Sequence, residues 1–138
     1  MNNQIVAHFK NGLLIKGYTQ DFMPQTETFT LLSEYDIDVR IKIRTTDLKA
    51  LFFVKTFEGN KNYLEKKTFN EFDAFGLRGL KIKTVFYDGE IMRGMSFDYS
   101  IYDKGFSFIP MDSLNNNEMV YVLADSLIEI ATGPEAEA

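Results

Sequence analysis

The chain has 138 residues, of which 45% are hydrophobic and 25% charged, and its formal net charge is −5. This is about one domain's length, and such a chain buries enough of its surface to need no covalent cross-link. The absence of cysteine excludes thiol nucleophiles, disulfides, thiolate zinc sites and iron–sulfur clusters, and a single histidine excludes multi-histidine metal sites. We therefore expect no cofactor and no metal.

The first residues lack a basic segment followed by an apolar one, so they do not resemble a signal peptide. The longest apolar run, residues 50–54, has the length of a strand and not of a membrane span. We expect a cytoplasmic protein without membrane association.

Charge is distributed unevenly along the chain. Residues 36–83 hold 11 basic and 7 acidic side chains, whereas residues 84–138 hold 2 basic and 10 acidic ones. The two parts can attract each other within one molecule or between copies, so a homo-oligomer is one open expectation. The whole chain is a poor binder of polyanions, because affinity for nucleic acid depends on clustered basic side chains.

An internal repeat divides the chain. Residues 5–33 align without a gap on residues 82–110. The identical pairs are Ile5 and Ile82, Phe9 and Phe86, Gly12 and Gly89, Gly17 and Gly94, Asp21 and Asp98, and Phe29 and Phe106. We interpret this pattern as a tandem duplication.

Each half predicts five strands. In chain order these are residues 5–9, 13–20, 29–32, 37–43 and 51–56, and then 85–87, 90–97, 106–109, 119–123 and 127–131. The pairs Asn11-Gly12 and Asp88-Gly89 predict type I′ hairpin turns after the first strand of each half. Gly17 and Gly94 lie inside the second strands, where glycine marks a bend or a close backbone approach, so we expect curved, closing sheets.

The resulting domain prediction has four parts: a first β-barrel at residues 1–56, a connecting segment at 57–79, a second β-barrel at 80–131, and a disordered acidic tail at 132–138. Residues 61–72 could make two or three helical turns, and the aromatic residues of the connecting segment predict that it packs on the barrels.

The repeated pattern resembles the first motif of the Sm-like small barrel. The residues that carry it are Phe9, Gly12, Ile15, Gly17, Asp21 and Phe29, and again Phe86, Gly89, Met92, Gly94, Asp98 and Phe106. The resemblance implies an all-β chain of two tandem Sm-like, SH3-like barrels. The second Sm motif, an isoleucine-arginine-glycine turn that supplies part of the RNA contact in Sm-like proteins, is absent from both halves.

Residues 48–60 resemble a family of uncharacterised bacterial domains that occur alone or alongside PilZ and other signalling domains. This resemblance implies a cytoplasmic bacterial protein and supplies no established activity.

Arg40, Lys42 and Arg44 alternate with isoleucines, and Lys49 and Lys55 follow downstream. One interpretation is an anion site for a nucleotide, a phosphate group or an acidic partner. The other, which we favour, is the solvated face of an amphipathic strand.

Large apolar side chains occupy equivalent loops, with Phe22 and Met23 in the first half and Tyr99 and Tyr102 in the second. If exposed, they are candidates for partner binding or base stacking. The alternative, which we favour, is that they plug the open barrel ends.

No constellation predicts catalysis. Asp21 and Asp98 could divide acid and base roles, but their equivalence in the repeat favours carboxylates that accept backbone N–H groups at strand ends. A lone His8 without a partner motif favours a structural role. We predict a non-catalytic protein-interaction or regulatory module, with a nucleotide, such as a cyclic dinucleotide, or an RNA as the alternative ligand.

Overall fold

The computed structural model describes residues 3–36, 38–57, 79–111 and 116–137. These residues form strands and short 3-10 helices, so the expectation of an all-β chain is confirmed. The first half contains β1 (Asn3–Phe9), β2 (Leu14–Thr19), β3 (Thr28–Ser33), β4 (Arg40–Arg44), η1 (Thr45–Asp47) and β5 (Leu48–Val54). The second half contains β6 (Leu80–Phe86), β7 (Ile91–Ser96), β8 (Gly105–Pro110), β9 (Asn117–Leu123), η2 (Ala124–Ser126), β10 (Leu127–Thr132) and η3 (Gly133–Glu137).

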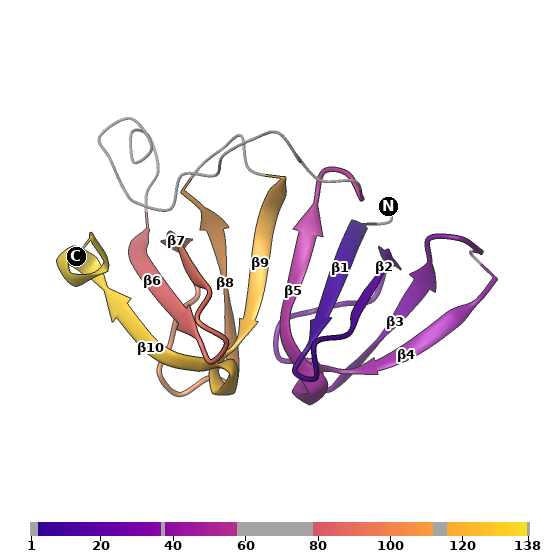
Figure 1. Ribbon diagram of the computed structural model, residues 1–138, viewed down its shortest axis with the longest axis horizontal. Coiled ribbons are helices and arrows are strands. Elements are labelled where there is room, and N and C mark those ends of the chain that lie inside the picture. The colour runs from indigo at the N-terminus through magenta and orange to yellow at the C-terminus, as the bar shows by residue number, and fades with distance from the viewer. Residues whose placement is uncertain (1–2, 37, 58–78, 112–115, 138) are drawn as a thin grey trace.

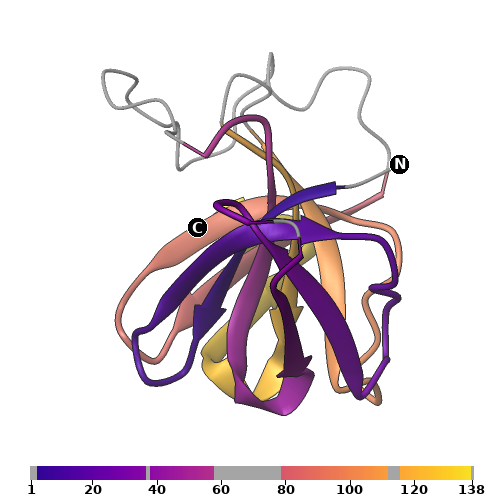
Figure 2. The same cartoon turned by 90° about the vertical axis from the view of Figure 1, so that its right-hand side faces the viewer.

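All the strands belong to one antiparallel sheet of ten strands, in the order β10-β6-β7-β8-β9-β5-β1-β2-β3-β4. Figure 1 places β5 and β9 side by side in the middle, with β4 and β10 at opposite ends. The two expected tandem barrels are not confirmed, because β5 of the first half pairs with β9 of the second and the strands form one continuous sheet that does not close. Figure 2, which looks onto the first half, shows how strongly its strands curve.

The two halves repeat the same strand pairing. Gly17 lies opposite Ser33 in β2 and β3, and Gly94 lies opposite Pro110 in β7 and β8. A Cβ added at either glycine would overlap a carbonyl oxygen of the neighbouring strand, that of Leu32 or of Ile109. These positions are thus close backbone approaches, as the sequence indicated.

The hairpin turns differ from the prediction. A type I′ turn needs a positive φ at both central residues, but in each turn only the glycine has one, +91° at Gly12 and +92° at Gly89. The N–H of Gly12 donates to the carbonyl of Phe9, and that of Gly89 to the carbonyl of Phe86. Each hairpin therefore has a three-residue loop, residues 10–12 or 87–89, in which the last residue is the glycine with positive φ.

Two hydrophobic clusters form the core, and each contains side chains from both halves. The cluster around Phe86 and Phe106 of the second half includes Ala50, Phe52 and Val54 of β5. The cluster around Phe29 and Leu31 of the first half includes Tyr121 and Leu123 of β9. Each half thus completes the core of the other, and the boundary between β5 and β9, which we call the seam, is part of the core.

Two further expectations differ from the structure. The strand expected at residues 37–43 begins only at Arg40, because the N–H of Val39 donates to the carbonyl of Asp36 in a turn. The acidic tail, expected to be disordered, forms η3: Ala136 is buried, and Lys81 Nζ lies 2.8 Å from Glu137 Oε1. Residue 37 and the helical turns expected at residues 61–72 lie outside the described residues.

Candidate functional site

The seam is held by a lysine that the sequence placed in a basic stripe. Lys49, on β5, is buried, and its Nζ lies 2.7 Å from both Asp88 Oδ2 and Glu90 Oε1 at the β6–β7 turn. The ammonium also lies 4.5 Å from the centre of the Phe86 ring. These contacts join the two halves through one charged group, so Lys49 belongs to the seam and not to an exposed anion site.

The electrostatics of this cluster follow from its geometry. Burial alone lowers the pKa of Lys49, but the hydrogen bonds and charges of Asp88 and Glu90 outweigh it and raise the pKa above its ordinary value. The hydrogen bond from Lys49 lowers the pKa of Asp88. Lys49 and Asp88 are therefore both charged near neutral pH.

His8 lies beside this cluster. Its ring centre is 4.2 Å from that of Phe52. Burial, together with the positive charge of Lys49, lowers the pKa of His8 from 6.5 to about 4. The imidazole is neutral at pH 7, which agrees with a structural role for His8.

The predicted basic residues lie together on the outermost strand of the first half. Arg40, Lys42 and Arg44 are all exposed on β4. Arg44 Nε is 3.9 Å from Asp47 Oδ2, which is the limit of an ion pair, and no described carboxylate pairs with Arg40 or Lys42. One side of β4 pairs with β3, and the other, which we call the open edge, has no neighbouring strand among the residues that the structure describes.

The four predicted residues of the two loops differ in burial, since two are packed and two are exposed. The ring of Phe22 packs edge-on against Phe29 and Tyr121, at 5.2 and 5.1 Å between ring centres. Tyr99 packs in the same way against Phe106, at 5.0 Å. Met23 and Tyr102, the other two members, are exposed at 68% and 91% of their surface. The loops thus supply both core packing and free side chains.

The paired aspartates accept hydrogen bonds at equivalent places. Asp21 Oδ1 accepts the N–H of Thr30 at 2.9 Å, and Asp98 Oδ1 accepts the N–H of Ser107 at the same distance. Asp98 Oδ2 also accepts the Ser107 hydroxyl at 2.8 Å. The donors lie on the third strand of each half and not in the loop, but both carboxylates bind backbone N–H groups as expected.

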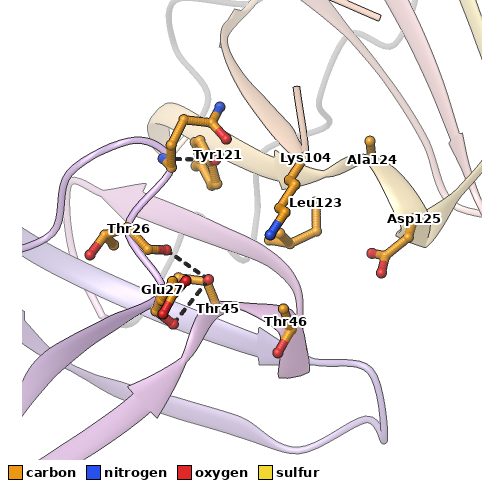
Figure 3. Close-up of a pocket in the computed structure, with 10 residues that line it drawn as sticks. Thr26, Glu27, Thr45, Thr46, Lys104, Tyr121, Leu123, Ala124 and Asp125 are labelled. Carbon is orange, nitrogen blue, oxygen red and sulfur yellow. Dashed lines mark hydrogen bonds between the residues drawn. The ribbon is translucent and has the colours of Figure 1, made fainter. Parts of the chain in front are cut away.

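A pocket of about 340 Å³ opens at the seam. In Figure 3, Lys104 extends from the second half toward Glu27, Thr45 and Thr46 of the first half. The remaining residues that line the pocket are Gln25, Thr26, Tyr121, Leu123, Ala124 and Asp125. The sequence did not single out these residues as a site, because they come from distant segments. The repeat alone offered a signal, since Glu27 and Lys104 are equivalent positions with opposite charge.

The described part of the chain holds no candidate metal site and no membrane-spanning helix. Within it, no group of three or more histidine, aspartate or glutamate side chains is arranged to hold a metal ion. None of its helices has the length and apolar character that crossing a bilayer requires.

The chain belongs to the family described as "Family of unknown function (DUF6982)", whose model matches residues 1–132. No curated protein and no solved structure matches it.

Proposed function

We propose that this member of the DUF6982 family is a non-catalytic protein-interaction module, of regulation or assembly, that accepts an extended strand of an acidic partner on the open edge of β4. The observation that carries the proposal is the open edge of β4, with Arg40, Lys42 and Arg44 exposed along the strand. In this proposal each half is an Sm-like unit whose fourth strand is a docking edge.

The seam supports this use of the edge. β9 is the fourth strand of the second half, and its outer edge is occupied by β5, with Ala50 opposite Val122 and Phe52 opposite Val120. β4 is the fourth strand of the first half and has the same edge free. Added strands bind through backbone hydrogen bonds, which do not depend on the partner's sequence, and side chains then provide selectivity.

The charges of β4 define the partner's chemistry. The three cations of β4 lie on one face of the strand, with one long ion pair among them. A free, positively charged edge resists pairing with copies of itself and favours a strand that carries carboxylates. The exposed Met23 and Tyr102 are further predicted contacts, whereas Phe22 and Tyr99 already pack within the molecule.

Calorimetry with a peptide of alternating glutamate and valine tests this function. We expect binding that weakens as salt is raised, and no binding of the matched lysine-valine peptide. Lys42→Glu should weaken binding of the acidic peptide by roughly tenfold, the effect of one charged contact at an edge. Lys55→Glu, which reverses the charge of another exposed lysine outside β4, should leave it unaltered. Equal affinity for both peptides would overturn the proposal.

The alternative ligand is a nucleotide or an RNA on the same cations. It needs aromatic rings that are free to stack, and the two rings that the sequence offered first, Phe22 and Tyr99, are packed. A cyclic dinucleotide and a short single-stranded RNA serve as the comparison ligands in the same calorimeter. If either bound more tightly than the acidic peptide and lost affinity in Lys42→Glu, the alternative would replace the proposed function.

A further inference from the structure

We infer that the strand accepted by β4 is β10 of a second copy of this chain, so that copies associate head to tail. This inference rests on the proposed function and names its partner. The seam joins the fifth strand of one half to the fourth strand of the other. Because each half has a fourth and a fifth strand, this contact leaves one fifth strand and one fourth strand without such a partner. These are β10 and β4, at the two ends of the sheet (Figure 1).

The two halves pair their strands in the same way, so each residue pair of the seam has an equivalent pair at the proposed contact between copies. The pair Phe29 and Ile43 in β3 and β4 recurs as Phe106 and Val122 in β8 and β9. The fifth strands have the same relation to the first strands: Ile5 lies opposite Phe53, and Ile82 opposite Thr132.

The transfer gives one register for the contact between copies. Ala50 lies opposite Val122 in the seam, and the equivalent residues are Glu129 of β10 and Ile43 of β4. By the same shift, Leu51 opposite Tyr121 becomes Ile130 opposite Lys42. In this register β10 of one copy and β4 of the next pair antiparallel, and the strand order within each half is unchanged.

The paired residues themselves are not oppositely charged, since Ile130 lies opposite Lys42 and Glu129 opposite Ile43, but charged and aromatic side chains flank them. At the seam the N–H of Gln25 donates to the hydroxyl of Tyr121, and the equivalent residues between copies are Tyr102 and Lys42. Asp103 follows Tyr102 and is exposed, as is Arg44 beside Lys42. The cations of β4 thus meet a tyrosine ring and a carboxylate of the next copy, both of which attract them.

Apolar side chains replace the ion cluster of the seam. Ile128 is the equivalent of Lys49, and Leu13 is the equivalent of Glu90. Ile128 is 69% exposed and Leu13 is 53% exposed, so both are free to pack on each other between copies. An isoleucine exposed at the outermost strand of the sheet leaves apolar surface in contact with water, whereas at this contact it covers the next hairpin.

Two variants, each blocked at one end, test the head-to-tail arrangement. Lys42→Glu/Arg44→Glu reverses the charge of β4, and Asp103→Lys/Ile128→Arg places cations where β10 meets β4. We expect ultracentrifugation of the wild type at low salt to give masses that are multiples of 15.9 kDa. Each variant alone should remain at 15.9 kDa, and their mixture should form dimers or larger multiples, because it holds an intact β10, an intact β4 and two substituted ends of opposite charge.

The chain that carries all four substitutions is a charge-swap test, because its acidic β4 again faces basic side chains of the next copy. It should associate with itself more than either double variant does, and circular dichroism should show that each variant retains the strand content of the wild type. A wild type that is monomeric at high concentration, or variants that do not associate when mixed, would overturn the inference.

The result is separable from that of the proposed function. The Asp103→Lys/Ile128→Arg variant retains an intact β4 and cannot associate with itself in the proposed way. If this variant binds the acidic peptide but does not associate with the Lys42→Glu/Arg44→Glu variant, the proposed function stands and the second copy is not the partner. If it does neither, both proposals fail.

Discussion

Lys49 Nζ lies 2.7 Å from Glu90 Oε1, which joins the fifth strand of one half to the first hairpin of the other. The lysine side chain is 7% exposed, whereas those of Asp88 and Glu90 are 44% and 41% exposed. The cation is thus the buried member of the group, and its two carboxylates remain in contact with solvent.

Lys49→Ala should therefore destabilise the whole sheet. We expect the free energy of unfolding to fall by about 2 kcal/mol, less than for a fully buried pair because the carboxylates regain water. Urea denaturation measures the change. Lys49→Met/Asp88→Asn/Glu90→Gln should recover most of the loss, since an apolar group of similar volume replaces the ion cluster. A triple variant less stable than Lys49→Ala would show that the charges themselves hold the seam.

His8 makes stability depend on pH between its two pKa values. The folded protein holds the pKa of His8 at about 4, below the ordinary 6.5, so the unfolded chain binds a proton first as the pH falls. Stability is therefore lost from about pH 6.5 down to about pH 4, by as much as about 3 kcal/mol. Urea denaturation at pH 7 and pH 4.5 measures this slope, and His8→Gln should flatten it. An equal slope in the variant would contradict the assignment.

The low pKa of Asp88 acts in a different pH range. Its pKa is held below the ordinary 3.8, mainly by the hydrogen bond from Lys49, so its contribution is present above that value and is lost as the pH falls through the folded pKa. Asp88→Asn should reduce stability at pH 7 and reduce the further loss below pH 4, as the same denaturation series would show. A full loss below pH 4 in Asp88→Asn would assign the acid sensitivity to other groups.

Asp98 and Asp21 should prove structural. Asp98 accepts three hydrogen bonds, from the N–H and hydroxyl of Ser107 and the hydroxyl of Ser96, whereas Asp21 accepts two, from Thr30 and Thr19. Thermal unfolding should show a loss of about 2 kcal/mol for Asp98→Ala and about 1 kcal/mol for Asp21→Ala. Binding of the acidic peptide should be unchanged in both folded variants, and a selective loss of binding would assign these carboxylates to the interaction site.

Substitution of Gly17 by alanine should destabilise the protein more than the same substitution at Gly12. A Cβ at Gly17 would collide with the carbonyl oxygen of Leu32 and the side chain of Leu31, whereas a Cβ at Gly12 meets nothing within 4 Å. Gly17→Ala therefore forces two strands apart, and we expect a loss of more than about 2 kcal/mol. Gly12→Ala bears only the strain of a positive φ, about 1 kcal/mol. Equal losses in urea denaturation would contradict the close approach.

Local patterns predicted the strands well and their partners poorly. The alternation of residues and the hairpin glycines lie close together in sequence, so the all-β class followed from them. The pairing of β5 with β9 joins strands far apart in the chain, and no periodicity indicates it. Two tandem barrels were therefore predicted, whereas in the structure each half completes the core of the other.

For the candidate site, too, local patterns predicted some placements, and contacts between distant segments decided the others. Arg40, Lys42 and Arg44 share one exposed strand as predicted, because a strand's period places alternate residues on one face. Lys49 looked like a continuation of that basic stripe, and only the contact between halves reveals that it is buried. Phe22 and Tyr99 differ from Met23 and Tyr102 in packing, a distinction that depends on the path of each loop and that composition does not carry.

Amide hydrogen exchange of residues 40–44, with and without the glutamate-valine peptide, tests the central claim most directly. The N–H groups of β4 that do not bond to β3 point to the open edge and should exchange quickly in the monomer. If the open edge accepts a strand, saturating peptide should slow their exchange, while the amides of β3 stay as they were. Unchanged exchange at β4 in the presence of bound peptide would contradict the account.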